Sequence, residues 1–301
     1  MDRRAGEPAG ALHALHELGV VMAPGEQVPR PPATPRRLSS LGRSLKGLRF
    51  STLLRPIGPL PLIVVIGLCL PAALSAVVSL SLDVAHSQAA SRPKLAQGAL
   101  GTSTNWAGYV VSHGHFTRVS ASWIVPAVKP GTQPTEVAAL WVCLDGRGTT
   151  NLEQIGTLSG MLGGSPAYEI WYEIVPQAPV YVNMAIKPGD SVTASVTTNG
   201  AGDFTLFIRN NTTHVAFTTN QPSPGAELVT AEVVAEAPAT VSGPTPLPDF
   251  GTITFTNARV NGRPIGTWRW TRLSMSSDTP QATTSPLARD AGTFSVAWKH
   301  E

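Results

Sequence analysis

The strongest constraint on the fold is a series of short β-type segments that begins at Thr102. From there on, runs of β-branched and aromatic residues are separated by Gly, Pro and Asn, and no long stretch carries the apolar stripe of a helix. Residues 191–197, 228–234 and 252–256 alternate with a period of two. The pattern predicts an all-β domain over residues 102–301, folded as an antiparallel sandwich or barrel.

The N-terminal third has a different composition. Residues 1–55 contain many Pro and Arg residues and predict a disordered, basic tail. Residues 56–82 include an apolar run from Leu60 to Leu82, which is long enough to span a bilayer and follows a basic flank. We therefore expect a signal sequence or membrane anchor, so that the β-domain is secreted or held outside the cytoplasm. Residues 83–101 predict a linker or short propeptide.

The charge is unevenly distributed along the chain. Residues 1–87 hold 9 Lys and Arg against 5 Asp and Glu, whereas the remainder holds 13 against 14. The β-domain therefore lacks the clustered positive charge that nucleic-acid binding requires. No nucleic-acid partner is expected.

Common catalytic motifs are missing from the sequence. It contains no zinc-binding His-Glu-x-x-His, no Gly-x-Ser-x-Gly elbow, and no phosphate or dinucleotide loop. His113 and His115 have no evident third metal ligand, and Cys143 lies in a predicted strand, which favours a buried structural cysteine. We predict neither a metal nor a cofactor.

Carboxylates are the remaining candidate chemistry. In the strand around residues 228–237, alternation places Glu232 and Glu236 on one face, opposite the apolar face of Ala231, Val233 and Ala235. The apolar face belongs in the core. The glutamates then lie either in a groove or on a solvated outer surface, and periodicity does not choose between these.

Several segments resemble those of one peptidase family, in the same order along the chain. They cover about residues 104–258 and are Asn105-Trp-Ala-Gly-Tyr109, Ser122-Trp-Ile-Val-Pro126, Trp141-Val-Cys-Leu-Asp-Gly146, Leu152-Glu-Gln-Ile-Gly156, Trp171-Tyr-Glu173, Pro188-Gly-Asp-Ser191, Ala231-Glu-Val-Val-Ala-Glu236 and Asp249-Phe-Gly251 with the strand that follows it. By these segments the chain is identified as a member of the glutamic peptidase (eqolisin) family.

The resemblance implies a fold and an activity. The fold is a concanavalin-like sandwich of two large antiparallel sheets with the active site on a concave face. The activity is that of an acid endopeptidase that acts on protein or peptide substrates, and we expect a monomer. The match places Glu232 on the catalytic glutamate and Gln154 on the catalytic glutamine. It implies supporting or substrate-binding roles for five further residues: Trp106, Trp141, Asp145, Glu173 and Glu236.

A carboxylate and a carboxamide suit peptide hydrolysis. The carboxylate takes the proton of the attacking water and returns it to the leaving nitrogen, and the carboxamide donates a hydrogen bond to the developing oxyanion without a titrating charge. Cys143 and Val233 depart from the family's Gly and Trp, which puts substrate specificity in doubt.

Two other function classes remain open. Trp106, Trp141 and Trp171 could line the groove of a non-catalytic carbohydrate-binding sandwich, since fold alone does not fix function. The domain could also be an anchored scaffold or adhesion module. A glycosidase pair of Glu153 and Glu232 is disfavoured. Glu153 and Gln154 must point to opposite faces of their strand, so only one of them can meet Glu232, and the family match selects Gln154.

Overall fold

The computed structural model describes residues 93–299 except 132, 241–242 and 276–280. The predicted tail, the predicted signal or anchor segment and residues 83–92 of the predicted linker lie outside the described residues. Within the described part, the only helix is a single 3-10 turn, η1 (Ile265–Thr267). No helix in that part is long and apolar enough to cross a membrane.

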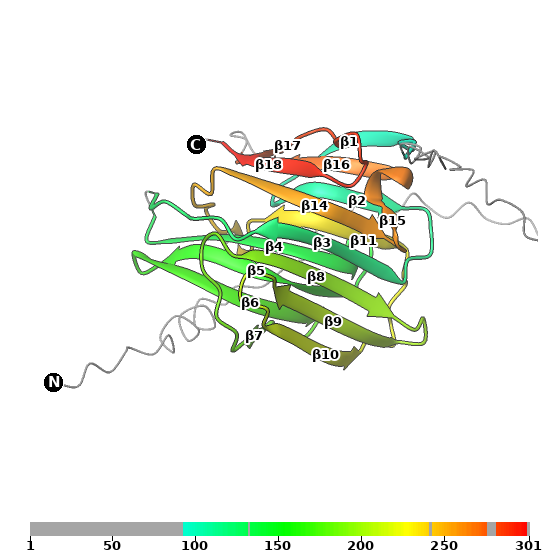
Figure 1. Ribbon diagram of the computed structural model, residues 1–301, viewed down its shortest axis with the longest axis horizontal. Helices are drawn as coiled ribbons and strands as arrows, with labels where there is room; N and C mark the ends of the chain where they lie inside the picture. Colours follow the sequence, from blue (N-terminus) through cyan, green and yellow to red (C-terminus); the bar gives the residue numbers. More distant parts are fainter. Residues whose placement is uncertain (1–92, 132, 241–242, 276–280, 300–301) are drawn as a thin grey trace, which may run out of the picture. The chain divides into compact units, whose positions relative to one another are not determined.

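Two eight-stranded sheets form the domain, and the second includes the short strand β15 (Arg263–Pro264) (Figure 1). The first sheet has the order β1 (Gly98–Ser103), β16 (Trp270–Met275), β2 (Trp106–Ser112), β11 (Thr230–Glu236), β4 (Thr135–Asp145), β5 (Leu152–Leu162), β6 (Ser165–Val175) and β7 (Val180–Val182). The second has the order β10 (Ala216–Pro222), β9 (Asp203–Asn210), β8 (Ser191–Thr198), β3 (Arg118–Ile124), β14 (Thr252–Val260), β18 (Phe294–Trp298) and β17 (Ala282–Thr284).

Three short elements complete the described chain. β15 (Arg263–Pro264) pairs with β14, and β12 (Ala239–Thr240) pairs with β13 (Gly243–Pro244). The all-β, two-sheet sandwich predicted from the sequence is confirmed.

The main core fills the space between the sheets. It includes Ala231, Val233 and Ala235 of β11 together with Phe204, Leu206 and Ile208 of β9. Period-two alternation therefore assigned the core face of β11 correctly.

A second apolar cluster lies on the other face of the first sheet. Trp106, Trp141, Trp171 and Val234 belong to it, and all four are fully buried. Strands β4, β5 and β11 are consequently buried on both faces. Of the two alternatives left open for Glu232 and Glu236, the solvated outer surface is excluded, since both residues are fully buried.

The edge of the first sheet departs from the antiparallel expectation. β1 pairs with β16 in parallel, from Gly98 opposite Trp270 to Ser103 opposite Met275. Gly98 suits this position because a side chain there would collide with the Trp270 ring. Residues 98–101, which the sequence predicts to be linker, thus belong to the sheet.

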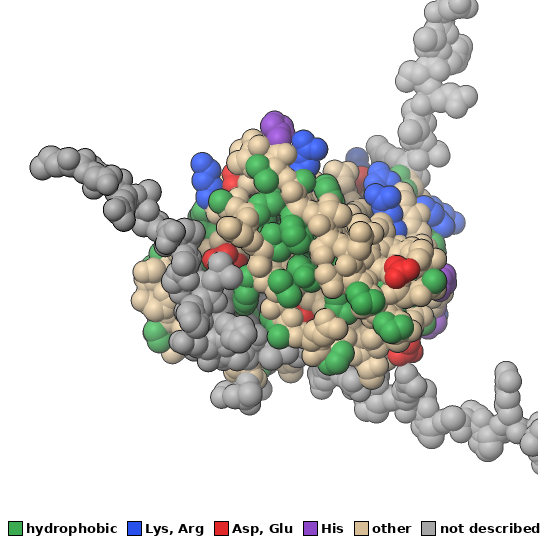
Figure 2. All heavy atoms as spheres, turned by 90° about the horizontal axis from the view of Figure 1, so that it is seen from below, with side chains coloured by type: hydrophobic (Ala, Val, Ile, Leu, Met, Phe, Trp, Pro, Cys, Tyr) green, Lys and Arg blue, Asp and Glu red, His purple; other side chains and the backbone are tan. Residues whose placement is uncertain are grey.

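The surface shown in Figure 2 carries scattered hydrophobic and many uncharged polar atoms, with Lys and Arg side chains near its margin. On this face the described residues form no broad basic patch, consistent with the near-neutral charge of the β-domain.

Candidate active site

One cross-strand row carries the predicted catalytic residues. Glu232 of β11 is paired with Cys143 of β4, Cys143 with Gln154 of β5, and Gln154 with Glu173 of β6. Residues directly opposite each other on neighbouring strands point to the same face of a sheet. Strands lie about 4.8 Å apart, so the backbones at Glu232 and Gln154 are roughly 10 Å apart, with Cys143 between them.

Neighbouring rows on this face hold the other predicted residues. Trp141 and Trp171 lie two residues along their strands from Cys143 and Glu173, and Glu236 lies four residues from Glu232. Trp106 is directly opposite Glu236 on β2. Gly156 lies on β5 between Trp141 and Trp171. It allows β4 and β5 to approach closely, because a side chain at this position would collide with the Leu140 carbonyl.

Glu236 is fully buried, and its two carboxylate oxygens have separate donors. Trp141 Nε1 donates to Oε2 at 2.8 Å, and Asn105 Nδ2 donates to Oε1 at 3.1 Å. Burial raises the pKa of Glu236 well above its ordinary value, while the hydrogen bond from the Trp141 indole opposes that shift. The negative charge of Glu173 raises it further.

Glu232 has different neighbours. Cys143 Sγ donates to its Oε2 at 3.0 Å, and the backbone N–H of Arg147, in the β4–β5 loop, donates to its Oε1 at 3.2 Å. Burial raises the pKa of Glu232 to about 8, with a smaller contribution from the charge of Asp145. Burial and the charge of Glu232 likewise raise the pKa of the Cys143 thiol. Cys143 is thus a buried partner of a carboxyl group.

Gln154 is held by Glu173. Its Nε2 donates to Glu173 Oε2 at 2.6 Å, and both side chains are buried. Burial raises the pKa of Glu173 to about 8, and the hydrogen bond from Gln154 opposes that shift. Gln154 Oε1 and Glu173 Oε1 have no hydrogen-bond partner in the described structure. The Nε1 atoms of Trp106 and Trp171 on this face also have none among the described residues, and unsatisfied buried polar atoms of this kind are groups that a substrate could satisfy.

The two glutamates of β11 experience different charges. The charge of Glu173, the residue bonded to Gln154, acts on Glu236, and the charge of Asp145 at the end of β4 acts on Glu232. Glu236 and Glu232 thus share one face of the sheet but differ in their donors and in the charges near them.

Asp145 ends β4, and its carboxylate bonds to the backbone that leads into β11. Its φ is +57°, and its carboxylate accepts the backbone N–H groups of residues 227, 228 and 229 at 2.7–2.9 Å. These bonds fix the segment that leads into β11. Asp145 thus supports the strand that carries both glutamates.

Glu153 faces away from the site. Its Oε1 accepts a hydrogen bond from Ser223 Oγ at 2.6 Å, and it is fully buried. This agrees with the prediction that Glu153 and Gln154 point to opposite faces, and it removes Glu153 and Glu232 as a glycosidase pair. The carbohydrate-binding alternative also loses support, because Trp106, Trp141 and Trp171 are fully buried rather than open to a sugar ring.

Asn105 is the contact residue that sequence reasoning missed. In the sequence it is the first residue of the segment Asn105–Tyr109 that resembles the peptidase family, and no periodic pattern indicates a function for it. Its role becomes visible only when β2 and β11 are paired.

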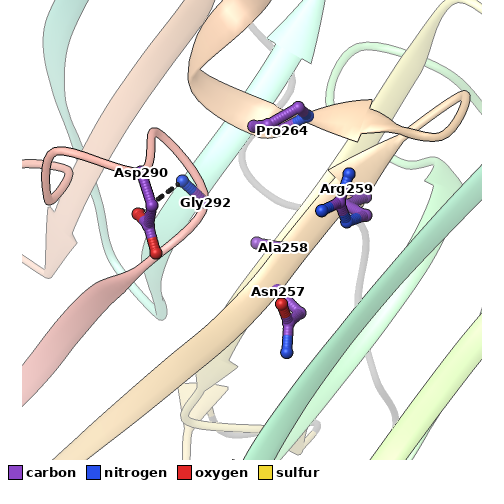
Figure 3. A pocket seen from close by; sticks show the side chains of 6 residues that line it. All are labelled: Asn257, Ala258, Arg259, Pro264, Asp290 and Gly292. Atoms are coloured by element: carbon purple, nitrogen blue, oxygen red, sulfur yellow. Dashed lines mark hydrogen bonds between the residues drawn. The ribbon is translucent and has the colours of Figure 1, made fainter. Parts of the chain in front are cut away.

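A separate hollow lies on the second sheet, lined by Asn257, Ala258, Arg259, Pro264, Asp290 and Gly292 (Figure 3). The Asp290 carboxylate stabilises the local turn, because its Oδ1 accepts the backbone N–H groups of Gly292 and Thr293. This hollow contains none of the residues of the candidate site.

Comparison with known proteins gives the family. Residues 104–298 match the model described as the Peptidase A4 family, which is more than half of the chain. The chain belongs to this family. Its class is that of the glutamic endopeptidases, as the sequence resemblance implied.

Individual proteins similar to this A4 peptidase support the family assignment. It is 28% identical over 218 residues to Aspergillopepsin-2 of Aspergillus niger, which covers 64% of this chain and 77% of that protein. Its fold is similar to that of scytalido-glutamic peptidase bound to a transition-state analogue inhibitor, with a TM-score of 0.57, 23% identity, and coverage of 65% of this chain and 98% of that one.

A further solved structure is SCP-B, a member of the eqolisin family in complex with the tripeptide Ala-Ile-His. The TM-score is 0.53 at 22% identity, with the same coverage of 65% and 98%. At these identities the two solved structures establish the sandwich fold of the A4 peptidase, and the roles of its residues are argued from its own contacts.

Proposed function

We propose that this A4 peptidase hydrolyses peptide bonds in protein or peptide substrates with Glu236 and Gln154 as its catalytic pair. The observation that carries the proposal is the set of contacts of Glu236. Asn105, just before β2, and Trp141 of β4 each donate to one of its oxygens, and the charge of Glu173, the partner of Gln154, acts on it. A general base needs such a defined orientation.

This differs from the sequence match, which placed Glu232 on the catalytic position. Glu232 receives a thiol and a backbone N–H, and the thiol of Cys143 lies in the row between it and Gln154. These contacts favour a structural role for Glu232, which leaves Glu236 as the better candidate for the base.

The reaction balances with one carboxylate and one amide. Glu236 accepts a proton from water as the water oxygen bonds to the substrate carbonyl carbon, and Gln154 Nε2 donates a hydrogen bond to the resulting oxyanion. Glu236 then gives that proton to the leaving nitrogen as the C–N bond breaks, which regenerates the carboxylate. All of these groups come from one chain, so a monomer is sufficient.

Paired substitutions test the assignment. Glu236→Gln and Glu232→Gln each keep the size of the side chain but cannot carry the proton, and both are compared with the wild type for cleavage of denatured protein at acid pH. We expect Glu236→Gln to be inactive at every pH and Glu232→Gln to retain activity. The reverse result would return the role to Glu232, and activity in both folded variants would contradict a glutamic mechanism altogether.

We also propose that residues beyond Leu82 are exported, because the apolar run follows a basic flank. A fusion of residues 1–100 to a reporter that is active only outside the cytoplasm should be active. A stable but inactive fusion would count against export. Fractionation of the active fusion then separates a cleaved signal from a retained anchor.

A further inference from the structure

Asn105 occupies a defined position between the start of β2 and the end of β11. It is 5% exposed, and its Nδ2 donates to Glu236 Oε1 at 3.1 Å. Its backbone carbonyl accepts the N–H of Ala237, the residue after Glu236, at 2.9 Å. Asn105 therefore holds both the side chain of Glu236 and the backbone beside it.

Ser103 fixes the orientation of the Asn105 amide. Ser103 Oγ accepts the backbone N–H groups of Asn105 at 3.4 Å and Trp106 at 3.1 Å, and it donates to Asn105 Oδ1 at 3.3 Å. With Oδ1 engaged by a hydroxyl donor, Nδ2 is the end that faces Glu236. The opposite orientation would place two acceptor oxygens against each other.

Glu236 needs such a donor because β2 and β4, the strands that flank β11, contain no Lys or Arg. The acidic groups on this face are Glu232 on its own strand, Cys143 and Asp145 on β4, Glu169 and Glu173 on β6, and Tyr181 on β7. Each becomes negative when it ionises, and the cation Arg147 lies in the β4–β5 loop with its guanidinium near Gly101 of β1. Hydrogen bonds from neutral donors are then the main means of favouring the ionised form of Glu236.

We propose that Asn105 is a positioning residue for catalysis, which orients the Glu236 carboxylate and stabilises its charged form for proton transfer. This inference rests on the proposed function, in which Glu236 is the base. It extends the catalytic arrangement to β2 and, through Ser103, to the end of the edge strand β1.

The pH profile of kcat/KM tests the role, measured for the full chain with Asn105→Ala and Asn105→Asp. A lost hydrogen bond to a charged group corresponds to about a one- to two-unit shift of the acid limb toward higher pH and to a loss of about 10-fold or more in activity at acid pH. Asn105→Asp keeps the size of Asn105 but places a second acid against Glu236, so we expect at least the same upward shift.

Asn210→Ala is the matched control. Asn210 is also fully buried and donates from Nδ2 to a carboxylate, Asp190 Oδ2, at 2.8 Å, but it lies on β9 of the second sheet. It should lower the melting temperature and leave the acid limb unchanged.

A wild-type acid limb in folded Asn105→Ala would overturn the inference. If Asn105→Ala does not fold, the isosteric Asn105→Asp decides in the same way. The Glu236→Gln variant distinguishes the positioning role of Asn105 from the proposed role of Glu236 as the base. An inactive Glu236→Gln with unshifted Asn105 variants refutes only the positioning role, whereas an active Glu236→Gln refutes the proposed base itself.

Discussion

Trp141 Nε1 donates a 2.8 Å hydrogen bond to Glu236 Oε2, although 95 residues separate the two along the chain. The contact arises because β4 and β11 are neighbours in the first sheet, with Trp141 opposite Val234 and Glu236 two residues farther along. When Glu236 is ionised, this bond is charge-assisted and stronger than one between neutral groups. It links β4 directly to the proposed base.

Replacement of this donor should move the acid limb of the activity profile. Trp141→Phe keeps most of the apolar volume and removes the N–H, so the pKa of Glu236 should rise and kcat/KM at acid pH should fall about 10-fold. Trp171→Phe is the control, because Trp171 lies in the same row but its Nε1 has no hydrogen-bond partner in the described structure. Equal shifts in both variants would show that lost packing, not the hydrogen bond, is responsible.

Gln154 should affect turnover more than folding. Removal of one oxyanion donor typically lowers kcat by about 10²- to 10³-fold, and Gln154→Ala should show that loss with little change in KM. Gln221→Ala provides a control, since Gln221 bonds to Tyr172 and Thr219 on the other side of the molecule's core. Wild-type turnover by a folded Gln154→Ala enzyme would refute the assignment.

Alternation along β11 was enough to predict its two faces. Ala231, Val233 and Ala235 do pack between the sheets, and Glu232 and Glu236 share the opposite face. The sequence could not separate the two glutamates by function, because residues four apart on a strand point in the same direction. Their distinction depends on donors from β2 and β4, which only the sheet order brings into contact.

The burial of the glutamate face was not predictable from β11 either. It results from tryptophans on three other strands, Trp106, Trp141 and Trp171, that meet in the second apolar cluster. β1 was missed for a related reason. Its sequence contains two glycines and lacks a strand pattern, and its position depends on pairing with β16, about 170 residues away.

Asp145 should be important for stability. Its carboxylate accepts three backbone N–H groups, and Asp145→Asn leaves a single acceptor oxygen for them, so we expect a loss of about 3 kcal/mol in the free energy of unfolding. Urea denaturation at acid pH measures it. Asp203→Asn is the control, because Asp203 is exposed and should change stability by less than about 0.5 kcal/mol. Similar losses for the two variants would contradict this role.

Ionisation of Glu153 should lower the free energy of unfolding as the pH rises. Glu153 faces the core between the sheets, and burial raises its pKa from 4.5 to about 8, against the opposing hydrogen bond from Ser223. The folded state therefore retains a proton that the unfolded chain loses above pH 4.5. Its contribution to stability is complete below that pH and is lost as the pH rises toward 8.

Glu173 and Glu232 shift in the same direction, so the wild type should show a falling free energy of unfolding between pH 4.5 and 8. Glu153→Gln can still accept a hydrogen bond from Ser223 but cannot ionise. It should flatten the dependence by up to about 1.4 kcal/mol per pH unit, whatever its effect on stability at acid pH. The measurement is urea denaturation at a series of pH values, with the slope against pH as the readout. A wild-type slope in the Glu153→Gln variant would mean that Glu153 titrates alike in the folded and unfolded chains and would contradict this prediction.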